Sequence, residues 1–558
     1  MNSCRRSLRL LSSLAFFLAV FSLTAAAADT RFKVTLPATF KQPVTGRVFV
    51  IISKVDNPEP RLQVGSWRSR ALLLGRDADL GPGQSITLDA LTPGFPLRSV
   101  RELPAGDYYV QALFNIYTRF QRSDGHTIFA HMDQWEGQQF NKSPGNLFSR
   151  ALQFHLDPLG GYEIQLSLES IIPPVQVPPD TQYVKHIKVQ SKTLSQFWGQ
   201  PIYLGATVLL PQGYAEHPNA HYPVLYQQGH FGLEPPLGFS EEQPKGEPAP
   251  PREGRISGQA LYKRWVSANF PRMIVVTLQH PTVFFDDSYA VNSANNGPYG
   301  DALMQELIPY VEEHFRIIRQ PYARLLTGGS TGGWESLALQ VFHPEFFGGT
   351  WTFYPDPVDF TRYGMVDAYN DVNAFLAPGY DPPVPERPMA RTPEGQVTTT
   401  IRQMSQLEEV LGSHGRSGQQ FEAWEAVYGP AGADGYPKPL WDKQTGRIDQ
   451  QVALYMRDHG YDLRYYLEQN WPRIGPQLVG KLHIYCGDMD NFYLNLAVYR
   501  LEDFLRSTTN PAYGGSFEYG RPMKGHGWTP LNQAELVNAM ADYITKHAPA
   551  GADKSWKY

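Results

Sequence analysis

A serine enclosed by glycines stands at residues 328–333, in the order Gly-Gly-Ser-Thr-Gly-Gly. A short apolar run, 323–326, comes before it, and the residues that follow place Trp334, Leu337, Ala338 and Val341 on one face of a helix. A strand, a tight turn and a helix in this order lift a serine hydroxyl off the end of the strand, and glycines on both sides let strand and helix approach each other. The pattern therefore predicts that Ser330 is a nucleophile.

A serine hydroxyl reacts only when a base removes its proton and a carboxylate orients that base. His526 lies in a glycine-rich loop, 524–528, between a predicted last strand at 514–519 and a closing helix from about 531 to 547. A histidine in a loop at a strand end can reach the serine, so His526 is the candidate base.

Two aspartates compete for the role of the acid. Asp488 and Asp490 both lie in the turn that follows a buried strand predicted at 481–486. The turn brings both carboxylates to the end of that strand, so position alone leaves the choice between them open. The chain order serine, acid, histidine holds for either.

These candidates and several flanking motifs resemble the putative-esterase family of α/β-hydrolases, which includes esterase D, S-formylglutathione hydrolase, feruloyl esterases, enterobactin esterases and mycolyltransferases. The resemblance spans about residues 203–548. It rests on the serine turn and on the segments 222–226, 306–311, 487–490 and 525–528. It implies an α/β-hydrolase fold, and it favours Asp490 because the acid of this family commonly lies three residues after a glycine such as Gly487.

The resemblance implies acyl transfer in two steps, through an acyl-enzyme on Ser330 that water resolves. The oxyanion would accept hydrogen bonds from the backbone N–H groups of Thr331 and Phe231. The family usually has His-Gly in the first loop, whereas this chain has Gly229-His230-Phe231. No metal or cofactor is required, and the expected function is a serine carboxylic ester hydrolase. An acyltransferase with the same triad, and a binding protein on a hydrolase scaffold, remain alternatives.

A polar loop, 280–301, follows the strand predicted at 273–278 and should reach the same edge of the sheet as the serine. We expect the substrate, a small-molecule or glycan-linked ester of the small acyl, aromatic acyl or siderophore type, to bind near this edge. The candidate binding residues are His230, Asp287, Asn292, Asn295 and Trp334. Alternatively the loop side chains satisfy the loop backbone, with Asp301 as the N-cap of the next helix. A calcium pair at Asp286 and Asp287 is a third interpretation.

After residue 28 the chain divides into three predicted parts. Short β-type runs with turn signals predict a β-sandwich-like domain at 29–171, and a proline-rich linker at 172–182 predicts a stiff spacer that holds the modules apart. The catalytic domain occupies 183–558 and contains a cap insertion at about 355–475, which we interpret as the specificity element. Within the first domain, residues 135–139 and 143–146 predict a structured turn, with a contact to the catalytic domain or substrate as the alternative.

The N-terminus predicts export. Arg5, Arg6 and Arg9 precede an apolar run at 10–23 and four alanines, which is typical of a cleaved signal peptide ending near residue 28. The expected location is the periplasm or the outside of the cell, with no transmembrane segment after cleavage. Cleavage leaves 46 basic and 54 acidic residues, a net charge of −8, which does not favour nucleic-acid binding. One cysteine, Cys486, would remain, so no internal disulfide is expected.

Overall fold

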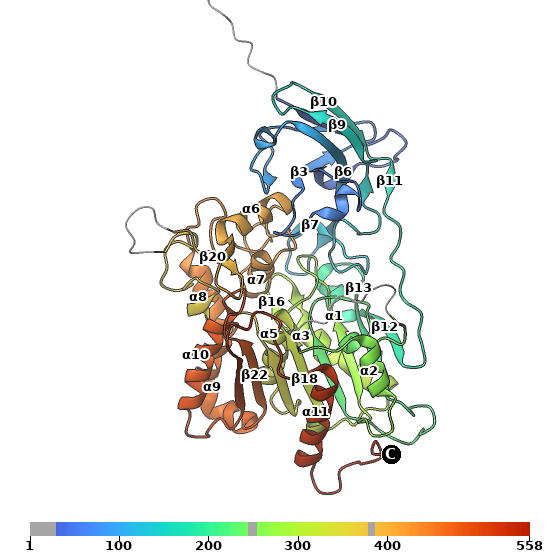
Figure 1. Ribbon diagram of the computed structural model, residues 1–558, viewed down its shortest axis with the longest axis vertical. Helices are drawn as coiled ribbons and strands as arrows, with labels where there is room; N and C mark the ends of the chain where they lie inside the picture. The colour runs from blue at the N-terminus through green and yellow to red at the C-terminus, as the bar shows by residue number, and fades with distance from the viewer. Residues whose placement is uncertain (1–28, 244–253, 378–384) are drawn as a thin grey trace, which may run out of the picture.

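The computed structural model describes residues 29–243, 254–377 and 385–558 (Figure 1). The predicted signal peptide lies outside the described residues, as do residues 378–384 of the predicted cap. Within the described part of the chain, no helix combines the length and the apolar character needed to cross a membrane.

An eight-stranded sheet forms the centre of the C-terminal part, in the order β12-β13-β15-β14-β18-β19-β22-β23 (Figure 1). β13 pairs antiparallel with both of its neighbours, and all pairs from β15 to β23 are parallel. The strands are β12 (Val184–Ser191), β13 (Ile202–Leu209), β14 (Val224–Gln228), β15 (Ile274–Gln279), β18 (Arg324–Gly329), β19 (Gly349–Phe353), β22 (Leu482–Gly487) and β23 (Ser516–Gly520). In chain order the strands lie as 1-2-4-3-5-6-7-8, which is the α/β-hydrolase order, so the predicted fold is confirmed.

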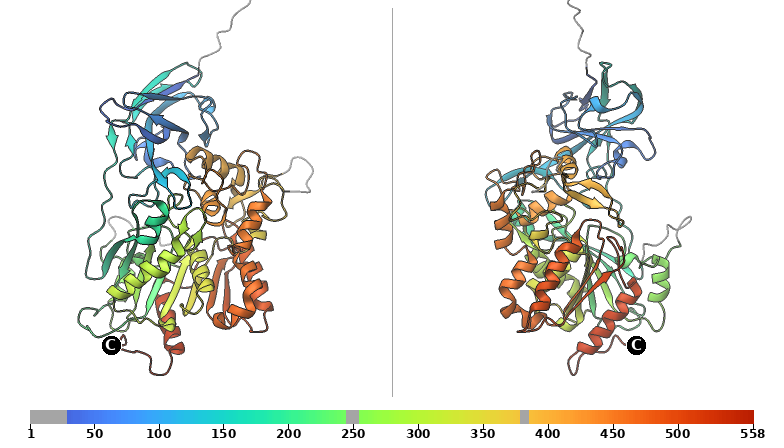
Figure 2. Two further views of the ribbon diagram at one scale, coloured as in Figure 1. Left: turned by 180° about the vertical axis from the view of Figure 1, so that it is seen from behind. Right: turned by 60° about the vertical axis from the view of Figure 1, so that its left-hand side comes forward.

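Helices cover both faces of this sheet, which explains why central strands such as β15 are buried along their whole length. Figure 2 (right) shows α9 and α10 on one side and α2 and α11 on the other. α5 packs on β14, β18 and β19. The helices of this part are α1 (Lys192–Trp198), α2 (Gly258–Trp265), α3 (Tyr299–Ala302), α4 (Ile308–His314), α5 (Thr331–Phe342), α9 (Leu463–Leu478), α10 (Leu494–Ser507) and α11 (Gln533–His547). Shorter helical turns lie at Pro60–Gln63, Val100–Glu102, Pro236–Gly238, Leu303–Leu307, Pro321–Ala323 and Phe360–Arg362.

The N-terminal part consists of two β-sheets. β10, β1 and β4 form one sheet, and β11, β8, β6, β2, β3 and β5 form the other, with β7 and β9 paired to the long strand β6. The strands are β1 (Arg31–Thr35), β2 (Val44–Ser53), β3 (Leu72–Leu80), β4 (Ser85–Leu88), β5 (Gly94–Phe95), β6 (Gly106–Gln121), β7 (Thr127–His131), β8 (Leu147–Phe148), β9 (Leu152–Leu156), β10 (Glu163–Ser167) and β11 (Ser170–Ile171).

The larger N-terminal sheet is buried on both faces. Val48 and Val50 of β2 belong to a core shared with the smaller sheet, whereas Phe49 and Ile51 belong to the main core of the molecule. Because successive side chains of a strand point to opposite faces, the second face of this sheet packs on the rest of the protein. The N-terminal domain therefore shares a core with the catalytic part.

The expectation that the linker holds the two modules apart is wrong. Figures 1 and 2 show the segment between β11 and β12 running down the side of the molecule while the N-terminal sheets rest on the cap and the catalytic part. Buried Arg47 donates to the backbone oxygens of Val410 at 2.8 Å and Glu409 at 2.6 Å, and buried Arg122 donates to that of Gly435 at 2.9 Å. Proline content restricts the linker's own backbone but does not determine whether the domains it joins touch.

The cap insertion contributes β20 (Pro388–Arg391), β21 (Val397–Thr400), α6 (Ile401–Leu411), α7 (Gln420–Tyr428) and α8 (Gln450–Asp458). A small hairpin, β16 (Asn292–Ser293) and β17 (Gly297–Pro298), contacts α7 from the loop after β15. Inside the cap, the Lys443 ammonium lies 2.9 Å from the Glu408 carboxylate and 3.1 Å from that of Glu425, all three side chains being nearly inaccessible. These ion pairs hold the cap together, and Figure 1 shows the cap between the N-terminal domain and the catalytic sheet.

Candidate active site

Ser330 occupies the turn between β18 and α5 with φ 59° and ψ −124°, a backbone conformation that costs a non-glycine residue about 1–3 kcal/mol. Three backbone hydrogen bonds hold this conformation. The Ser330 N–H donates to Phe353 O at 3.1 Å, and Ser330 O accepts from the N–H groups of Trp334 at 3.1 Å and Asp356 at 3.2 Å. The strained turn presents the serine hydroxyl at the carboxyl edge of the sheet, as the sequence predicts.

Two glycines make the turn possible. A Cβ on Gly328 would lie 2.0 Å from the backbone oxygen of Gly332, and a Cβ on Gly332 would lie 2.2 Å from that of Gln228. Both distances are far below van der Waals contact, so neither position accepts a side chain. The close approach brings the start of α5 against the end of β14, where the Gly229-His230-Phe231 loop begins.

His526 and Asp490 form a hydrogen-bonded pair, with 2.8 Å between Nδ1 of the imidazole and Oδ2 of the carboxylate. The Asp490 side chain is completely inaccessible, and its Oδ1 accepts from the backbone N–H groups of Phe492 at 2.8 Å and Leu494 at 3.3 Å. The His526 N–H donates to Asn491 Oδ1 at 2.7 Å, which holds the histidine loop. Since Nδ1 is engaged, Nε2 is the ring nitrogen left to act on a hydroxyl.

Asp488 has a different position. Its Oδ1 accepts from the backbone N–H of Lys524 at 3.1 Å, so it supports the loop that carries His526. Of the two aspartates that the sequence leaves open, Asp490 is the one paired with the imidazole.

Ser330 and His526 line one cavity of about 710 Å³ that three separate parts of the chain enclose. The N-terminal domain contributes Trp67 and the loop residues 137–141, and the cap contributes a largely apolar wall. The principal wall residues of the cap are Met365, Met404, Phe421 and Trp424. The segment 135–139 is therefore both a structured turn and a contact of the catalytic domain, because Gln138 donates to Thr282 O and Trp135 packs edge to face on Phe231 at 5.2 Å.

Asp356 is a residue of the site that sequence reasoning missed. Its Oδ1 lies 3.4 Å from the Ser330 hydroxyl oxygen, and its side chain is almost completely buried at the wall of the cavity. Its Oδ2 accepts from Tyr289 Oη at 2.6 Å, Thr331 Oγ1 at 3.1 Å, Gln420 Nε2 at 3.2 Å and Trp424 Nε1 at 3.2 Å. Asp356 thus ties the cap helix α7 to the serine turn. The sequence offers one local signal for it, the Pro-Asp-Pro at 355–357, where the predicted cap insertion begins.

The predicted substrate-binding residues separate into two groups. His230 lines the cavity with its side chain half exposed, and Asp287 lies behind it, buried, with Oδ2 3.4 Å from His230 Nδ1. The other three do not line it. Asn292 is exposed and donates to Asp301 Oδ2 at 3.0 Å, whereas buried Asn295 donates to the backbone oxygens of α7 and its C-terminal end at 3.1 and 2.9 Å.

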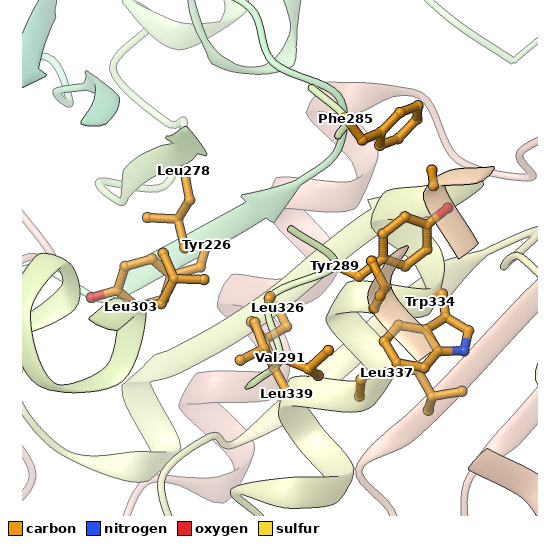
Figure 3. Close-up of a cluster of buried hydrophobic side chains, with 14 of the residues drawn as sticks. Tyr226, Leu278, Phe285, Tyr289, Val291, Leu303, Leu326, Trp334, Leu337 and Leu339 are labelled. Carbon is orange, nitrogen blue, oxygen red and sulfur yellow. The ribbon is translucent and has the colours of Figure 1, made fainter. Parts of the chain in front are cut away.

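Trp334 is a core residue rather than a binding residue. It is fully buried, and its ring packs against that of Tyr289, with 5.6 Å between ring centres (Figure 3). The ring centre of Tyr428 lies 5.1 Å from that of Trp334. The prediction of Asp301 as an N-cap is also wrong, because α3 begins at Tyr299 and Asp301 lies within it. α5 is buried along almost its whole length, and Trp334 fills the space between the loop after β15 and the end of the cap helix α7.

The two predicted oxyanion donors come from different elements. Thr331 is the first residue of α5, where a backbone N–H has no partner inside the helix. Phe231 follows His230 in the loop after β14, and its ring is held by Trp135 of the N-terminal domain.

Charge near this loop comes from His230 and the two aspartates. The Asp286 carboxylate lies 3.0 Å from His230 Nδ1, and this charge raises the pKa of the His230 imidazole well above its usual value. Burial raises the pKa of the Asp287 carboxyl to about 7 and lowers that of His280 to about 4. The structure thus brings together a histidine and two aspartates on the side of the cavity formed by the loops after β14 and β15.

The part of the chain that carries the serine turn matches a known protein family. Residues 203–358 match the family described as "Putative esterase". This stretch contains the loop after β14, the serine turn and Asp356, and it confirms the resemblance predicted from the sequence. The family match supports an ester hydrolase.

Solved structures with a similar arrangement include a ferulic acid esterase, with 14% identity over 65% of this chain and 99% of that chain and a TM-score of 0.36. An S-formylglutathione hydrolase from Agrobacterium tumefaciens matches with 13% identity, 66% and 96% coverage and a TM-score of 0.32. The fluorophosphonate-binding serine hydrolase FphF from Staphylococcus aureus matches with 13% identity, 65% and 98% coverage and a TM-score of 0.30. No curated protein matches the chain. At these values the structural likenesses add nothing to the fold that the strand order establishes.

Proposed function

We propose that this protein is a serine carboxylic ester hydrolase with Ser330 as nucleophile, His526 as general base and Asp490 as the residue that orients the imidazole. One observation carries the proposal: a single cavity is lined by a serine in a strained strand-to-helix turn and by a histidine bonded to a buried aspartate. The three residues come from loops after β18, β22 and β23, which all end at the same edge of the parallel sheet.

In the first step the Ser330 oxygen forms a bond to the ester carbonyl carbon while Nε2 of His526 takes the hydroxyl proton. The tetrahedral adduct then breaks its bond to the alcohol oxygen, which leaves with the proton from His526. Asp490 keeps Nδ1–H facing the carboxylate and stabilises the imidazolium that forms between these events. The product of the step is an acyl-enzyme and a free alcohol.

In the second step water attacks the acyl carbon while His526 takes a proton from the water. The adduct then breaks its bond to the Ser330 oxygen, which receives that proton from His526, and the carboxylic acid is released. An alcohol in place of water would give transfer rather than hydrolysis. The two outcomes differ only in the acceptor, so product analysis with an added alcohol distinguishes them.

The negative oxygen of each tetrahedral adduct would accept hydrogen bonds from the backbone N–H groups of Thr331 and Phe231. The Thr331 N–H lies in the first turn of the 12-residue helix α5, where the helix dipole also favours negative charge. The second donor is the N–H of Phe231, whose ring packs on Trp135 of the N-terminal domain. This contact supports the position of the loop that carries the donor.

The cavity supports a bulky ester as substrate. Its volume of about 710 Å³ and its wall of aromatic and methionine side chains suit an aromatic or extended apolar group on one side of the ester. Because Trp67 and Phe140 of the N-terminal domain and Trp424 of the cap line the same space, both additions to the catalytic domain would select the substrate.

We also propose that the protein is exported to the periplasm or beyond, on the basis of residues 1–28 alone. Mass determination of the N-terminus of protein recovered from the periplasmic and medium fractions tests this. An uncleaved N-terminus in cytoplasmic protein would contradict it.

The nucleophile is tested by treating the protein with a fluorophosphonate probe and locating the labelled peptide by mass spectrometry. We expect labelling at Ser330 that disappears in the His526→Ala variant, because the probe reacts only with an activated serine. Absence of labelling in folded protein, together with no hydrolysis of any nitrophenyl ester from acetate to cinnamate, would overturn the proposal.

A further inference from the structure

A second cluster of titratable side chains lies at the oxyanion loop, separate from the His526–Asp490 pair. His230 follows β14, Asp286 and Asp287 follow β15, and Glu335 lies in the first turns of α5. The coordinating atoms of His230, Asp286 and Asp287 all lie within 4.8 Å of one another. Three elements that surround Ser330 therefore meet at this cluster.

The cluster has an excess of carboxylates in a buried place. Glu335 is completely inaccessible, and Asp287 is 1% exposed. Within residues 29–243, 254–377 and 385–558, no lysine or arginine pairs with any of the three carboxylates, and their ion-pair partners are histidines. Three carboxylates that share one imidazole with a raised pKa have more negative charge than this partner can balance, so they require a further proton or cation.

Several buried polar atoms point into the cluster without a hydrogen-bond partner. Both carboxyl oxygens of Glu335 and Oδ2 of Asp287 are in this state. His280 does not supply a strong partner, since its Nδ1 accepts from the Ser288 N–H at 3.0 Å and its Nε2 remains 3.9 Å from Glu335 Oε1. Glu335 belongs to a different element from the two aspartates and points independently to the same missing partner.

We propose that His230, Asp286 and Asp287 bind one divalent transition-metal ion of the zinc type, with the Glu335 carboxylate completing or supporting the site. His230 Nδ1 lies 3.0 Å from Asp286 Oδ1 and 3.4 Å from Asp287 Oδ2. Ligand atoms at about 2.0–2.1 Å around a tetrahedral zinc are separated by roughly 3.3 Å, so a metal fits among these atoms with small shifts.

The donor set indicates which ion binds. One imidazole nitrogen with two or three carboxylates suits zinc or a neighbouring transition metal, whereas calcium and magnesium prefer oxygen ligands throughout. His230 and Asp286 line the cavity, which gives the ion a route from solvent.

Such an ion would join the loop after β14 to the loop after β15 and to helix α5. The first of these carries Phe231, a proposed oxyanion donor, and α5 begins at Thr331, the other one. The ion would therefore hold the two donors in register without taking part in the acyl transfer. Its binding is measured without substrate and does not depend on the proposed hydrolase activity.

The test uses the tag-free full-length protein, stripped with a chelator and titrated with zinc by calorimetry, alongside metal analysis of protein that has not been stripped. We expect one equivalent of zinc with micromolar or tighter affinity, and a rise in melting temperature on binding. Asp287→Asn and His230→Gln should each weaken binding at least tenfold. Asp301→Asn is the matched control, because Asp301 follows the same loop and contacts Asn292 rather than the cluster.

Two results would overturn the proposal. One is the absence of stoichiometric zinc binding by folded wild-type protein, which would leave a proton shared by Asp287 and Glu335 as the partner. The other is binding that His230→Gln and Asp287→Asn leave unchanged, which would place the zinc elsewhere. His230 is half exposed, so the His230→Gln variant should fold even if Asp287→Asn does not.

Discussion

Two histidines line the same cavity, each hydrogen-bonded to an aspartate, and their surroundings separate their roles. His526 meets one carboxylate, Asp490, whose second oxygen is occupied by two backbone N–H groups. His230 meets Asp286 and Asp287, behind which lies a third carboxyl group, Glu335, with no donor of its own. The first pair is a closed arrangement around one imidazole, whereas the second leaves buried carboxyl oxygens without a donor.

Residue types alone therefore do not assign a catalytic role to a histidine and an aspartate. A catalytic imidazole needs one carboxylate to fix its tautomer and a free Nε2 directed at the nucleophile. An imidazole among several carboxylates is held as a cation or as a metal ligand instead, and the pKa of His230 is raised accordingly.

Removal of the nucleophile should have the largest effect. Ser330→Ala should lower ester hydrolysis by at least about 10⁴-fold, because no other group can form the acyl-enzyme. Initial rates with a nitrophenyl ester measure this. Ser336→Ala, in the same helix, is the control, since the Ser336 hydroxyl donates to Gly333 O and lies away from the cavity. Equal losses in both variants would mean that damage to α5, rather than loss of the nucleophile, explains the result.

The two aspartates of the turn after β22 should differ strongly. Asp490→Asn should reduce kcat by about 10³–10⁴-fold, because an amide no longer holds the imidazole in the required tautomer, while Asp488→Asn should cost less than about tenfold. Steady-state kinetics of the two variants make the comparison. A larger loss for Asp488→Asn would contradict the assignment of Asp490.

Replacement of His526 and replacement of His230 should have different effects on covalent labelling of Ser330. His526→Gln should abolish fluorophosphonate labelling of Ser330, whereas His230→Gln should leave labelling complete and lower the ester rate by roughly ten- to a hundredfold through a displaced oxyanion loop. Intact mass after prolonged incubation measures the labelled fraction. Loss of labelling in both variants would remove the distinction between the pairs.

Removing a side chain from the cavity wall that the N-terminal domain forms should have the smallest effect on catalysis. This effect should be confined to large substrates. Trp67→Ala should raise KM for a cinnamoyl ester by roughly tenfold and leave an acetyl ester nearly unchanged, because the lost contact is apolar and distant from the carbonyl. Leu91→Ala, at an exposed position of the same domain, is the control. A uniform change with both esters would show that Trp67 supports the fold rather than the substrate.

Local patterns predicted the serine turn well. The glycines at 328, 329, 332 and 333 allow the close approach of strand and helix that this turn requires, and the strand before the turn and the helix after it are buried along almost their whole length. The histidine loop and the turn with two aspartates were also found, since both follow predicted strands of a parallel sheet. The choice of Asp490 needed the resemblance to a family, and the structure then showed its hydrogen bond to His526.

Other residues of the site were not predictable because their roles depend on contacts between distant segments. Asp356 binds side chains from α7 and from the loop after β15, and no short-range pattern indicates such partners. Asn295 and Trp334 have residue types that suit a binding site, yet they hold the cap and the core. The same limit explains why the linker suggested separate modules.

By itself, the sequence determined the parts of this protein that local backbone conformation controls: the turn at Ser330 and the strand ends that carry Asp490 and His526. Only the tertiary structure decided which aspartate meets the imidazole, which domains enclose the cavity, and that His230 lies beside three carboxyl groups. The reason is physical. A turn is selected by the conformational freedom of a few neighbouring residues, whereas a pocket and its charges are sums over segments that meet only after folding.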